Sequence, residues 1–147
     1  MQNTIAIIGS GDVGSTIAYT LLLKNVATSV TLIDSDEKRC RGQWLDLSDA
    51  VLQSKVTHIK TGNYTDAQAA DIIIICAGAR QLRGQTRVSL LQINKKIIQQ
   101  ILKQITPVKK DACIIMVTNP VDVLTHLAVS LSKLPANRVL GSGTILE

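Results

Sequence analysis

The residues with the clearest chemical potential form a glycine-rich stretch near the N-terminus, GSGDVG at residues 9–14. This GxGxxG spacing follows an apolar run at 4–8 and opens a helical pattern. Gly9 permits a tight turn, Gly11 lets the backbone approach a pyrophosphate, and Gly14 lets the helix pack close to the strand. The free amides and positive dipole end of such a helix attract an anion. The stretch therefore predicts a site for a dinucleotide.

An acidic residue, Asp34, ends the next apolar run along the chain. A carboxylate about 20 residues after the glycine motif accepts hydrogen bonds from an adenosine ribose and repels a 2′-phosphate. The two features together predict NAD rather than NADP as the cofactor. A turn or helix cap formed by Asp34, Ser35 and Asp36 is the alternative. A glycine motif, a strand, a helix and an acid in this order favour dinucleotide binding.

Two polar segments follow later apolar runs, AGARQLRGQTR at 77–87 and VTNP at 117–120. Loops at the carboxyl ends of parallel strands line the ligand crevice of a doubly wound sheet. Arginine can bind a carboxylate in bidentate fashion or polarise a carbonyl. Asn119 can donate to a carbonyl or hydroxyl, and Pro120 can carry a cis bond. From spacing alone, a solvated basic loop and a helix cap remain open alternatives.

Short apolar runs alternate with longer helical patterns, and these elements must position the polar groups. We expect strands at 4–8, 30–34, 56–60, 71–77, 112–117 and 138–141, and helices at 12–24, 37–53, 89–105 and 121–134. The first helix has Val13, Ile17 and Leu21 among its apolar positions. Strands joined by helical crossovers predict an α/β fold. We expect a doubly wound, parallel, six-stranded sheet of the Rossmann type with strand order 3-2-1-4-5-6.

The composition is that of a folded globular protein and excludes several function classes. The 147 residues are 46% hydrophobic but contain no Phe, so the core must be aliphatic. Scarce aromatic residues and scattered lysines argue against a nucleic-acid partner despite the net charge of +5. No uncharged apolar run approaches the roughly 20 residues needed to cross a bilayer, so we expect no membrane partner.

The cysteines and histidines are not expected to do chemistry. Cys40, Cys76 and Cys113 have no metal-ligand spacing, which predicts free thiols in a reducing cytoplasm and no metal site. The N-terminus has no basic segment of a signal peptide, which agrees with a cytoplasmic location. His58 lies in a predicted strand and His126 in a predicted helix, so both are expected to be structural or surface residues.

Taken together, the chain resembles the first half of the L-lactate/malate dehydrogenase family and is most similar to its L-lactate dehydrogenases. The resemblance rests on IAIIGSGDVGS, LIDSDEKRCRGQWLDLSDA, CAGARQLRGQTR, VTNPVDVLTHLA and RVLGSGTILE, which span nearly the whole chain. It implies a dinucleotide-binding domain over residues 1–147, with the C-terminal catalytic domain absent from this chain. It also implies a glycolytic oxidoreductase that transfers a hydride between NAD and a small L-2-hydroxy acid and is a homo-oligomer at full length.

The resemblance implies a role for individual residues. Those assigned to the cofactor are Gly9, Gly11, Asp12, Val13, Gly14, Asp34, Ala77, Gly78, Val117 and Asn119. Asn119 also contacts a substrate oxygen, segment 79–87 closes over the substrate as a lid, and Arg87 polarises the reacting carbonyl. Gln81 matches the position that separates the substrates: Gln is typical of lactate-type members and Arg of malate-type members. Arg80 and Arg83 beside it keep malate as the alternative substrate.

The last stretch, GSGTILE at 141–147, has the capping-box spacing of a helix start at Thr144 and Glu147. By resemblance, Glu147 falls where the family has the Asp that orients the catalytic histidine, a carboxylate role we assign to it. Neither His58 nor His126 matches that histidine, so we expect the chain alone not to turn over lactate. A non-catalytic NAD-binding module is the alternative function, although such a module needs neither Arg87 nor Gln81.

Overall fold

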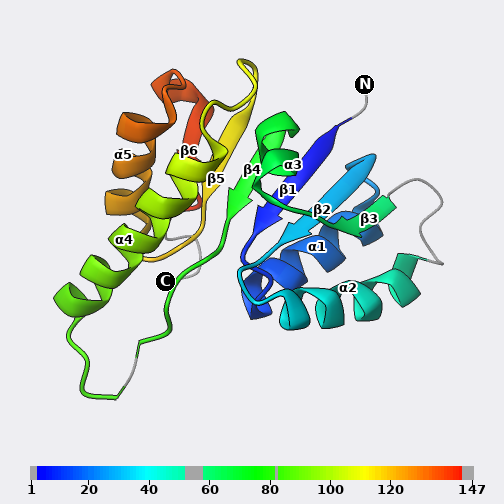
Figure 1. Cartoon of the computed structure of the whole chain (residues 1–147), viewed down its shortest axis with the longest axis horizontal. Helices are drawn as coiled ribbons and strands as arrows, with labels where there is room; N and C mark the ends of the chain where they lie inside the picture. The colour runs from blue at the N-terminus through cyan, green and yellow to red at the C-terminus, as the bar shows by residue number, and fades with distance from the viewer. Residues whose placement is uncertain (1–2, 52–57, 82, 144–147) are drawn as a thin grey trace.

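The computed structural model describes residues 3–51, 58–81 and 83–143. Within these ranges six strands form one sheet in the order β3-β2-β1-β4-β5-β6 (Figure 1). The strands are β1 (Thr4–Ile8), β2 (Ser29–Ile33), β3 (His58–Thr61), β4 (Ile72–Ile75), β5 (Cys113–Met116) and β6 (Val139–Gly141). All five neighbouring pairs are parallel. The predicted doubly wound fold and its strand order are confirmed.

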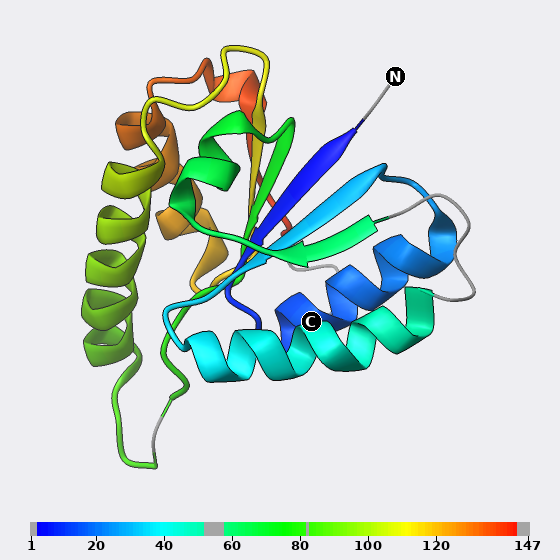
Figure 2. The same ribbon diagram turned by 45° about the vertical axis from the view of Figure 1, so that its right-hand side comes forward.

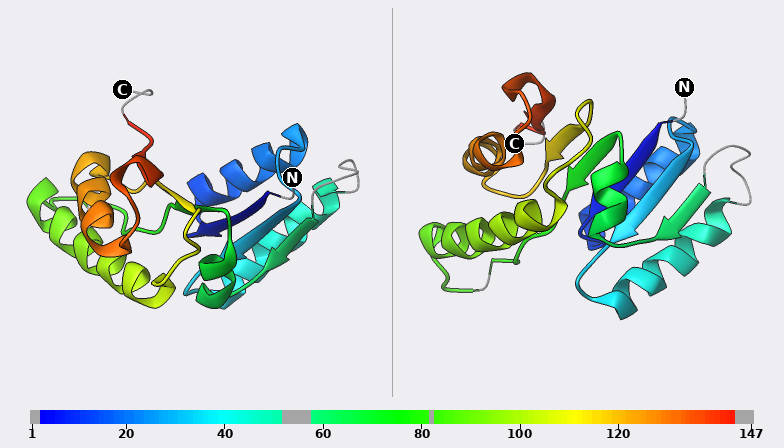
Figure 3. Two further views of the ribbon diagram at one scale, coloured as in Figure 1. Left: turned by 90° about the horizontal axis from the view of Figure 1, so that it is seen from above. Right: turned by 45° about the horizontal axis from the view of Figure 1, so that its top comes forward.

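The helices connect the strands, and four of the five described α-helices lie in two pairs. They are α1 (Asp12–Lys24), α2 (Glu37–Val51), α3 (Tyr64–Ala69), α4 (Arg87–Ile105) and α5 (Val121–Ser132), with a 3₁₀ turn η1 (Ala136–Arg138) before β6. Helix α1 lies beside α2, and α4 lies beside α5 (Figure 2). Figure 3 shows the strands between these two pairs. None of the described helices is both long and apolar enough to cross a lipid bilayer.

Strand β1 contributes side chains to both hydrophobic cores. Successive side chains of a strand point to opposite faces of a sheet. Ala6 and Ile8 belong to the core that includes residues of α3, α4 and α5, whereas Ile5 and Ile7 belong to the core that includes residues of α1 and α2. All four side chains are at least 96% buried, because their exposures are 4% or less. A central parallel strand must be apolar on both faces for this reason.

The buried face of α1 differs from the predicted apolar positions. Gly14, Ala18 and Leu22 are its buried residues, whereas Val13 is 54% exposed. The small residues on this face let the helix approach the sheet closely, and a Cβ atom on Gly14 would collide with the carbonyl oxygen of Gly9. Close packing of the helix on the strand therefore decides its orientation, and the larger apolar side chains do not.

Helix α4 begins at Arg87, two residues before the predicted start. The hydroxyl of Thr86 accepts a hydrogen bond from the backbone N–H of Ser89 at 3.1 Å, as a helix N-cap does. Arg87 therefore lies in the first turn of a helix and not in the preceding loop. Helix α5 ends at Ser132, before the predicted Leu134, because Lys133 adopts a left-handed conformation with φ of 61°.

The short helix α3 was not predicted from the sequence. Its six residues are too few to show a helical period. The signal that marks it is the capping box. The side chain of Asn63 accepts from the N–H of Asp66 at 3.3 Å, and the carboxylate of Asp66 accepts from the N–H of Asn63 at 2.9 Å. The predicted end of α2 at residue 53 and start of β3 at 56 lie outside the described residues.

Candidate functional site

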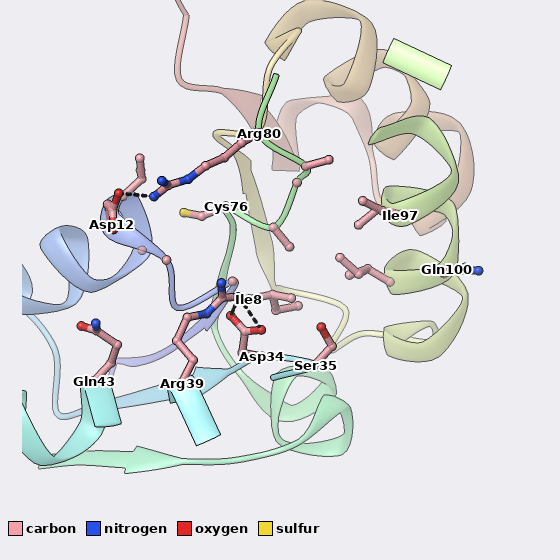
Figure 4. A pocket seen from close by; sticks show the side chains of 18 of the residues that line it. Ile8, Asp12, Asp34, Ser35, Arg39, Gln43, Cys76, Arg80, Ile97 and Gln100 are labelled. Carbon is pink, nitrogen blue, oxygen red and sulfur yellow. Dashed lines mark hydrogen bonds and ion pairs between the residues drawn. The ribbon is translucent and has the colours of Figure 1, made fainter. Parts of the chain in front are cut away.

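A cleft of about 850 Å³ opens at the carboxyl ends of β1, β2 and β4 (Figure 4). Its walls are the glycine stretch, the start of α2, the segment after β4 and one side of α4. Predicted cofactor residues that line it are Gly9, Gly11, Asp12, Val13, Gly14, Asp34, Ala77 and Gly78. The cleft lies near the upper end of the volume range of small-molecule sites, about 300–1,000 Å³, which suits an extended ligand.

The glycine stretch begins with a backbone conformation that other residues rarely adopt. Gly9 has a φ of 100°, and a Cβ atom on it would lie 2.5 Å from the backbone nitrogen of Ala77. At Gly11 no atom lies within 4 Å of the corresponding position, so the backbone faces open space in the cleft. The turn is therefore tight on the protein side and open on the ligand side, as a phosphate loop requires.

The N-terminus of α1 faces the cleft without a side-chain cap. Its N-cap is Gly11, which makes no side-chain hydrogen bond, and Gly11, Asp12 and Val13 line the cleft. The first amides of a helix have no partner within the helix and carry a partial positive charge. This end of the cleft is thus suited to the pyrophosphate of a dinucleotide.

Asp34 lies at the other end of the cleft with its side chain only 4% exposed. Its carboxylate accepts from the N–H of Ser10 at 2.7 Å and from one guanidinium nitrogen of Arg39, 2.9 Å from each oxygen. Burial by itself raises the pKa of Asp34. Hydrogen bonds from the amides of Asp36 and Ser10, from Arg39 and from the Ser10 hydroxyl outweigh that effect and hold the pKa below its ordinary value. Asp34 is therefore a carboxylate at neutral pH, the form that accepts hydrogen bonds from ribose hydroxyls.

The segment after β4 contacts the glycine stretch through an ion pair. Arg80 and Asp12 pair across the mouth of the cleft, and both side chains are more than 80% exposed (Figure 4). Arg80 was predicted as a possible partner of a dicarboxylate substrate. In this structure it is directed at the α1 end of the cleft, where the pyrophosphate is expected, and sequence reasoning missed this position.

A buried asparagine of α4, Asn94, was also missed. It is 2% exposed; its side-chain oxygen accepts from the N–H of Ala79 at 2.8 Å, and its side-chain nitrogen donates to the carbonyl of Asn119 at 2.8 Å. The hydroxyl of Thr118 adds a bond to the carbonyl of Ala77 at 2.9 Å. These contacts join the segments that follow β4 and β5. A polar residue at an apolar position of the α4 pattern is the signal that could have found it.

The other predicted site residues lie outside the cleft lining. Val117 is half-buried at the end of β5, and Asn119 is exposed and precedes Pro120 through a cis peptide bond. Gln81 donates to the carbonyl of Gln85 at 2.9 Å within the loop. Arg87 is exposed in the first turn of α4. Glu147 and the proposed capping box at 144–147 lie outside the described residues.

The cysteines and the possible metal ligands were also located relative to the cleft. The three cysteines are free thiols, and only Cys76 lines the cleft. Burial raises the pKa of Cys76 to about 11, so its thiol stays protonated at neutral pH and is a poor nucleophile. Within the ranges that the structure describes, no group of His, Cys, Asp and Glu residues could hold a metal ion.

Comparison with known proteins agrees with this geometry. Residues 3–141 match the profile of the lactate/malate dehydrogenase, NAD binding domain. The chain is 43% identical to a probable L-lactate dehydrogenase of Schizosaccharomyces pombe over 97% of this chain and 43% of that protein. It is 42% identical to L-lactate dehydrogenase A of Rhizopus oryzae over 100% of this chain and 46% of that protein.

Solved structures give the same assignment. The crystal structure of the minor L-lactate dehydrogenase from Enterococcus mundtii has a TM-score of 0.91 and 37% sequence identity, and covers 97% of this chain and 46% of that one. The chain thus spans about half the length of the relatives it matches. With its glycine stretch, Asp34 and parallel sheet, this chain belongs to the lactate/malate dehydrogenase family and corresponds to its NAD-binding domain, with NAD as the cofactor.

Proposed function

We propose that this chain is the cofactor half of an NAD-dependent dehydrogenase that interconverts L-lactate and pyruvate. The observation that carries the proposal is the link from the cleft to the predicted substrate residues. Asn94 bonds both to Ala79, where the lid begins, and to Asn119. A module that only bound a dinucleotide would need no such link, and no lid carrying Gln81 and Arg87.

In this proposal the cleft holds the adenosine ribose and the pyrophosphate, and the nicotinamide extends beyond the cleft lining. Asp34 would hold the adenosine ribose, and the amides at the start of α1 would hold the pyrophosphate. Val117 and Asn119 would lie beside the nicotinamide. When bound, NAD accepts or supplies the hydride. The protein holds the cofactor in place and orients the substrate against it, which accounts for a large part of the rate enhancement in such reactions.

Arg87 is the residue we propose to polarise the substrate carbonyl. It occupies the first turn of α4, where the helix has no acidic residue. A cation at this end of a helix is unfavourable for the helix itself. Residues that are unfavourable for local structure, as this cation is for the helix dipole, are expected at functional sites. Negative charge grows on the carbonyl oxygen as the hydride arrives, so the guanidinium stabilises the transition state more than the ground state.

Gln81 is the residue we propose to select the substrate. A neutral amide suits the methyl group of pyruvate, whereas oxaloacetate would bring a second carboxylate that needs a cation. Arg80 pairs with Asp12 in this structure, but both side chains are exposed, so the pair does not hold Arg80 away from a second carboxylate. Arg83 is exposed in the same loop, which keeps oxaloacetate as the second candidate substrate.

A histidine is the group we propose to transfer the proton, and neither His58 nor His126 lines the cleft. His58 begins β3 and therefore lies at the amino-terminal end of the strands, away from the cleft, and His126 is exposed on α5. We therefore propose that the proton-transferring residue and the substrate-carboxylate ligand belong to a second domain. The chain alone is then expected to bind NADH without reducing pyruvate.

We also propose a cytoplasmic location and a homo-oligomeric state for the full-length enzyme. The three free thiols are compatible with a reducing compartment. Size-exclusion chromatography with light scattering on the full-length protein tests the oligomeric state.

The test of the function is steady-state oxidation of NADH by the protein made from its full reading frame. We expect kcat/KM for pyruvate to exceed that for oxaloacetate by about tenfold or more. The reverse order would favour a malate dehydrogenase. NADH binding without turnover of either substrate would favour a non-catalytic module and contradict the proposal.

A further inference from the structure

The carboxylate of Asp34 is already saturated with hydrogen-bond donors. Oδ2 accepts from the N–H and the hydroxyl of Ser10 at 2.7 and 3.0 Å, and Oδ1 accepts from the N–H of Asp36 at 3.0 Å. One guanidinium nitrogen of Arg39 lies 2.9 Å from both oxygens. A carboxylate offers about four lone-pair positions. A ribose can therefore bind Asp34 only if one of these donors gives up its place.

Arg39 is the donor that can leave. Ser10 is fully buried in the glycine stretch, and the Asp36 donor is a backbone amide that precedes α2, so neither can move far. The side chain of Arg39 is 50% exposed and reaches Asp34 from the first turn of α2. Because half of the Arg39 side chain faces solvent, water can take over its contacts when it leaves Asp34, and a ribose hydroxyl can then replace it as the donor.

After leaving Asp34, the guanidinium would still lie at the cleft wall. Arg39, Ser35 and Gln43 all line the cleft on this side (Figure 4). Arg39 and Gln43 are four residues apart on α2 and therefore share one face of the helix. This wall thus offers a cation, a hydroxyl and an amide beside the ribose site. Guanidinium binds phosphate in bidentate fashion, and an arginine near the ribose-binding acid is the usual means of accommodating a 2′-phosphate.

The charges that surround this position do not all favour an anion. Asp34 faces Arg39 directly, and Asp36 and Glu37 precede it in the chain, whereas Lys38 adds a second cation. A 2′-phosphate would therefore meet attraction from Arg39 and repulsion from Asp34. The two effects oppose each other at the same place, so the balance between them sets the cofactor preference.

We propose that Arg39 is a cofactor-specificity residue that competes with the ribose of NAD(H) for Asp34 and offers a cation to a 2′-phosphate. This chain then binds NADP(H) measurably, although more weakly than NAD(H). The inference rests on the NAD site described above. It extends the prediction from Asp34 alone, which would exclude NADP.

The experiment measures the dissociation constants of NADH and NADPH, by nucleotide fluorescence and calorimetry, for the full-reading-frame protein and three variants. Arg39→Met keeps the aliphatic stem and removes the charge. We expect it to weaken NADPH about tenfold, the loss of one charged hydrogen-bonding partner, while NADH stays within about threefold or tightens because Asp34 is released. Lys38→Met is the matched control, since it removes the same charge one residue away from the contact, and it should leave the NADPH to NADH ratio nearly unchanged.

The third variant, Asp34→Ser, removes the repulsion and releases Arg39. We expect it to tighten NADPH relative to NADH by at least tenfold, and the double variant Asp34→Ser with Arg39→Met should lose most of that gain. Two results would overturn the role of Arg39: no NADPH binding by the unaltered protein at 1,000 times the NADH dissociation constant, or equal effects of Arg39→Met and Lys38→Met. Failure of the unaltered protein to bind NADH would instead contradict the NAD site itself, and the inference with it.

Discussion

At the scale of single residues, Gln81 is the side chain that we propose to determine which substrate the lid accepts. Gln81 is exposed, and its amide bonds to the loop backbone at Gln85. A neutral group in this position leaves a second substrate carboxylate without a counter-charge, and an unpaired charge in a closed site is costly. Substrate choice is therefore expected to depend on the charge at this position and not on the size of the cleft.

The first prediction replaces Gln81 by Arg in the full-length enzyme. The new guanidinium should pair with the second carboxylate of oxaloacetate, so kcat/KM for oxaloacetate relative to pyruvate should rise by about tenfold or more. Steady-state kinetics with both substrates measures the ratio. Gln92→Arg, the same change at an exposed position of α4, is the control and should not move it. An unchanged ratio in Gln81→Arg would show that another residue discriminates.

The second prediction concerns the buried Asn94, which connects Ala79, at the start of the proposed lid, to Asn119. Asn94→Ala leaves the N–H of Ala79 and the carbonyl of Asn119 without their partner, and should cost about 1–3 kcal/mol of stability. It should also lower kcat, because Asn119 loses its support. Asn94→Asp keeps the acceptor for Ala79 and should recover part of the stability but less of kcat. Urea unfolding and steady-state kinetics separate the two effects, with Gln92→Ala as an exposed control. Full activity in Asn94→Ala would rule out the positioning role.

At the scale of elements, the long helices and strands could be predicted from the sequence, but the site contacts could not. Apolar periodicity located α1, α4 and the strands to within about two residues, because burial on the sheet imposes that period. The period does not identify which face packs, so the exposure of Val13 was not foreseen. The glycine stretch and Asp34, which line the cleft, could be singled out from the sequence because their spacing is local. Asn94 and Arg39 could not be identified in this way. Their side chains contact residues of other segments, and the spacing of residues in the sequence does not reveal such contacts.

The third prediction tests the position of Arg87 at the start of α4. Replacing it by Ala removes a cation from the positive end of the helix dipole and should raise stability by about 0.3–1 kcal/mol. The same change should lower kcat of the full-length enzyme by about 100-fold or more, because the transition-state oxyanion loses its cation. Thermal unfolding and pyruvate kinetics are the measurements. Arg83→Ala, in the loop before the helix, is the comparison. A variant that is less stable and fully active would contradict both parts.

At the scale of the whole molecule, a carboxylate connects the amino-terminal ends of the central strands, at the end of the sheet away from the cleft. Asp71 accepts from the N–H and hydroxyl of Thr4 at 2.9 and 2.8 Å and pairs with Lys109. These residues come from the start of β1, the approach to β4 and the approach to β5. These contacts therefore connect three central strands at the end of the sheet away from the ligand. The contacts of Asp71 stabilise one end of the sheet, and polar groups such as Asp34 at the other end serve binding.

The fourth prediction follows from the ionisation of Asp71. The hydrogen bond from Lys109, followed by those from Thr4, lowers the pKa of Asp71 to about 2, from an ordinary value of 3.8. A carboxyl whose folded pKa is depressed stabilises the fold above its unfolded pKa, and this stabilisation is lost as the pH falls towards 2. Since solvent screens a group that is partly exposed, we expect a loss of about 1 kcal/mol between pH 5 and pH 2 from this residue.

Urea unfolding of the unaltered chain and of Asp71→Asn at several pH values separates the contribution of Asp71 from those of Asp34 and Asp66, whose pKa values are also lowered. The difference in unfolding free energy between the two proteins should be constant above pH 5 and shrink below pH 4. A difference that does not depend on pH would show that Asp71 acts through its hydrogen bonds alone and not through its charge.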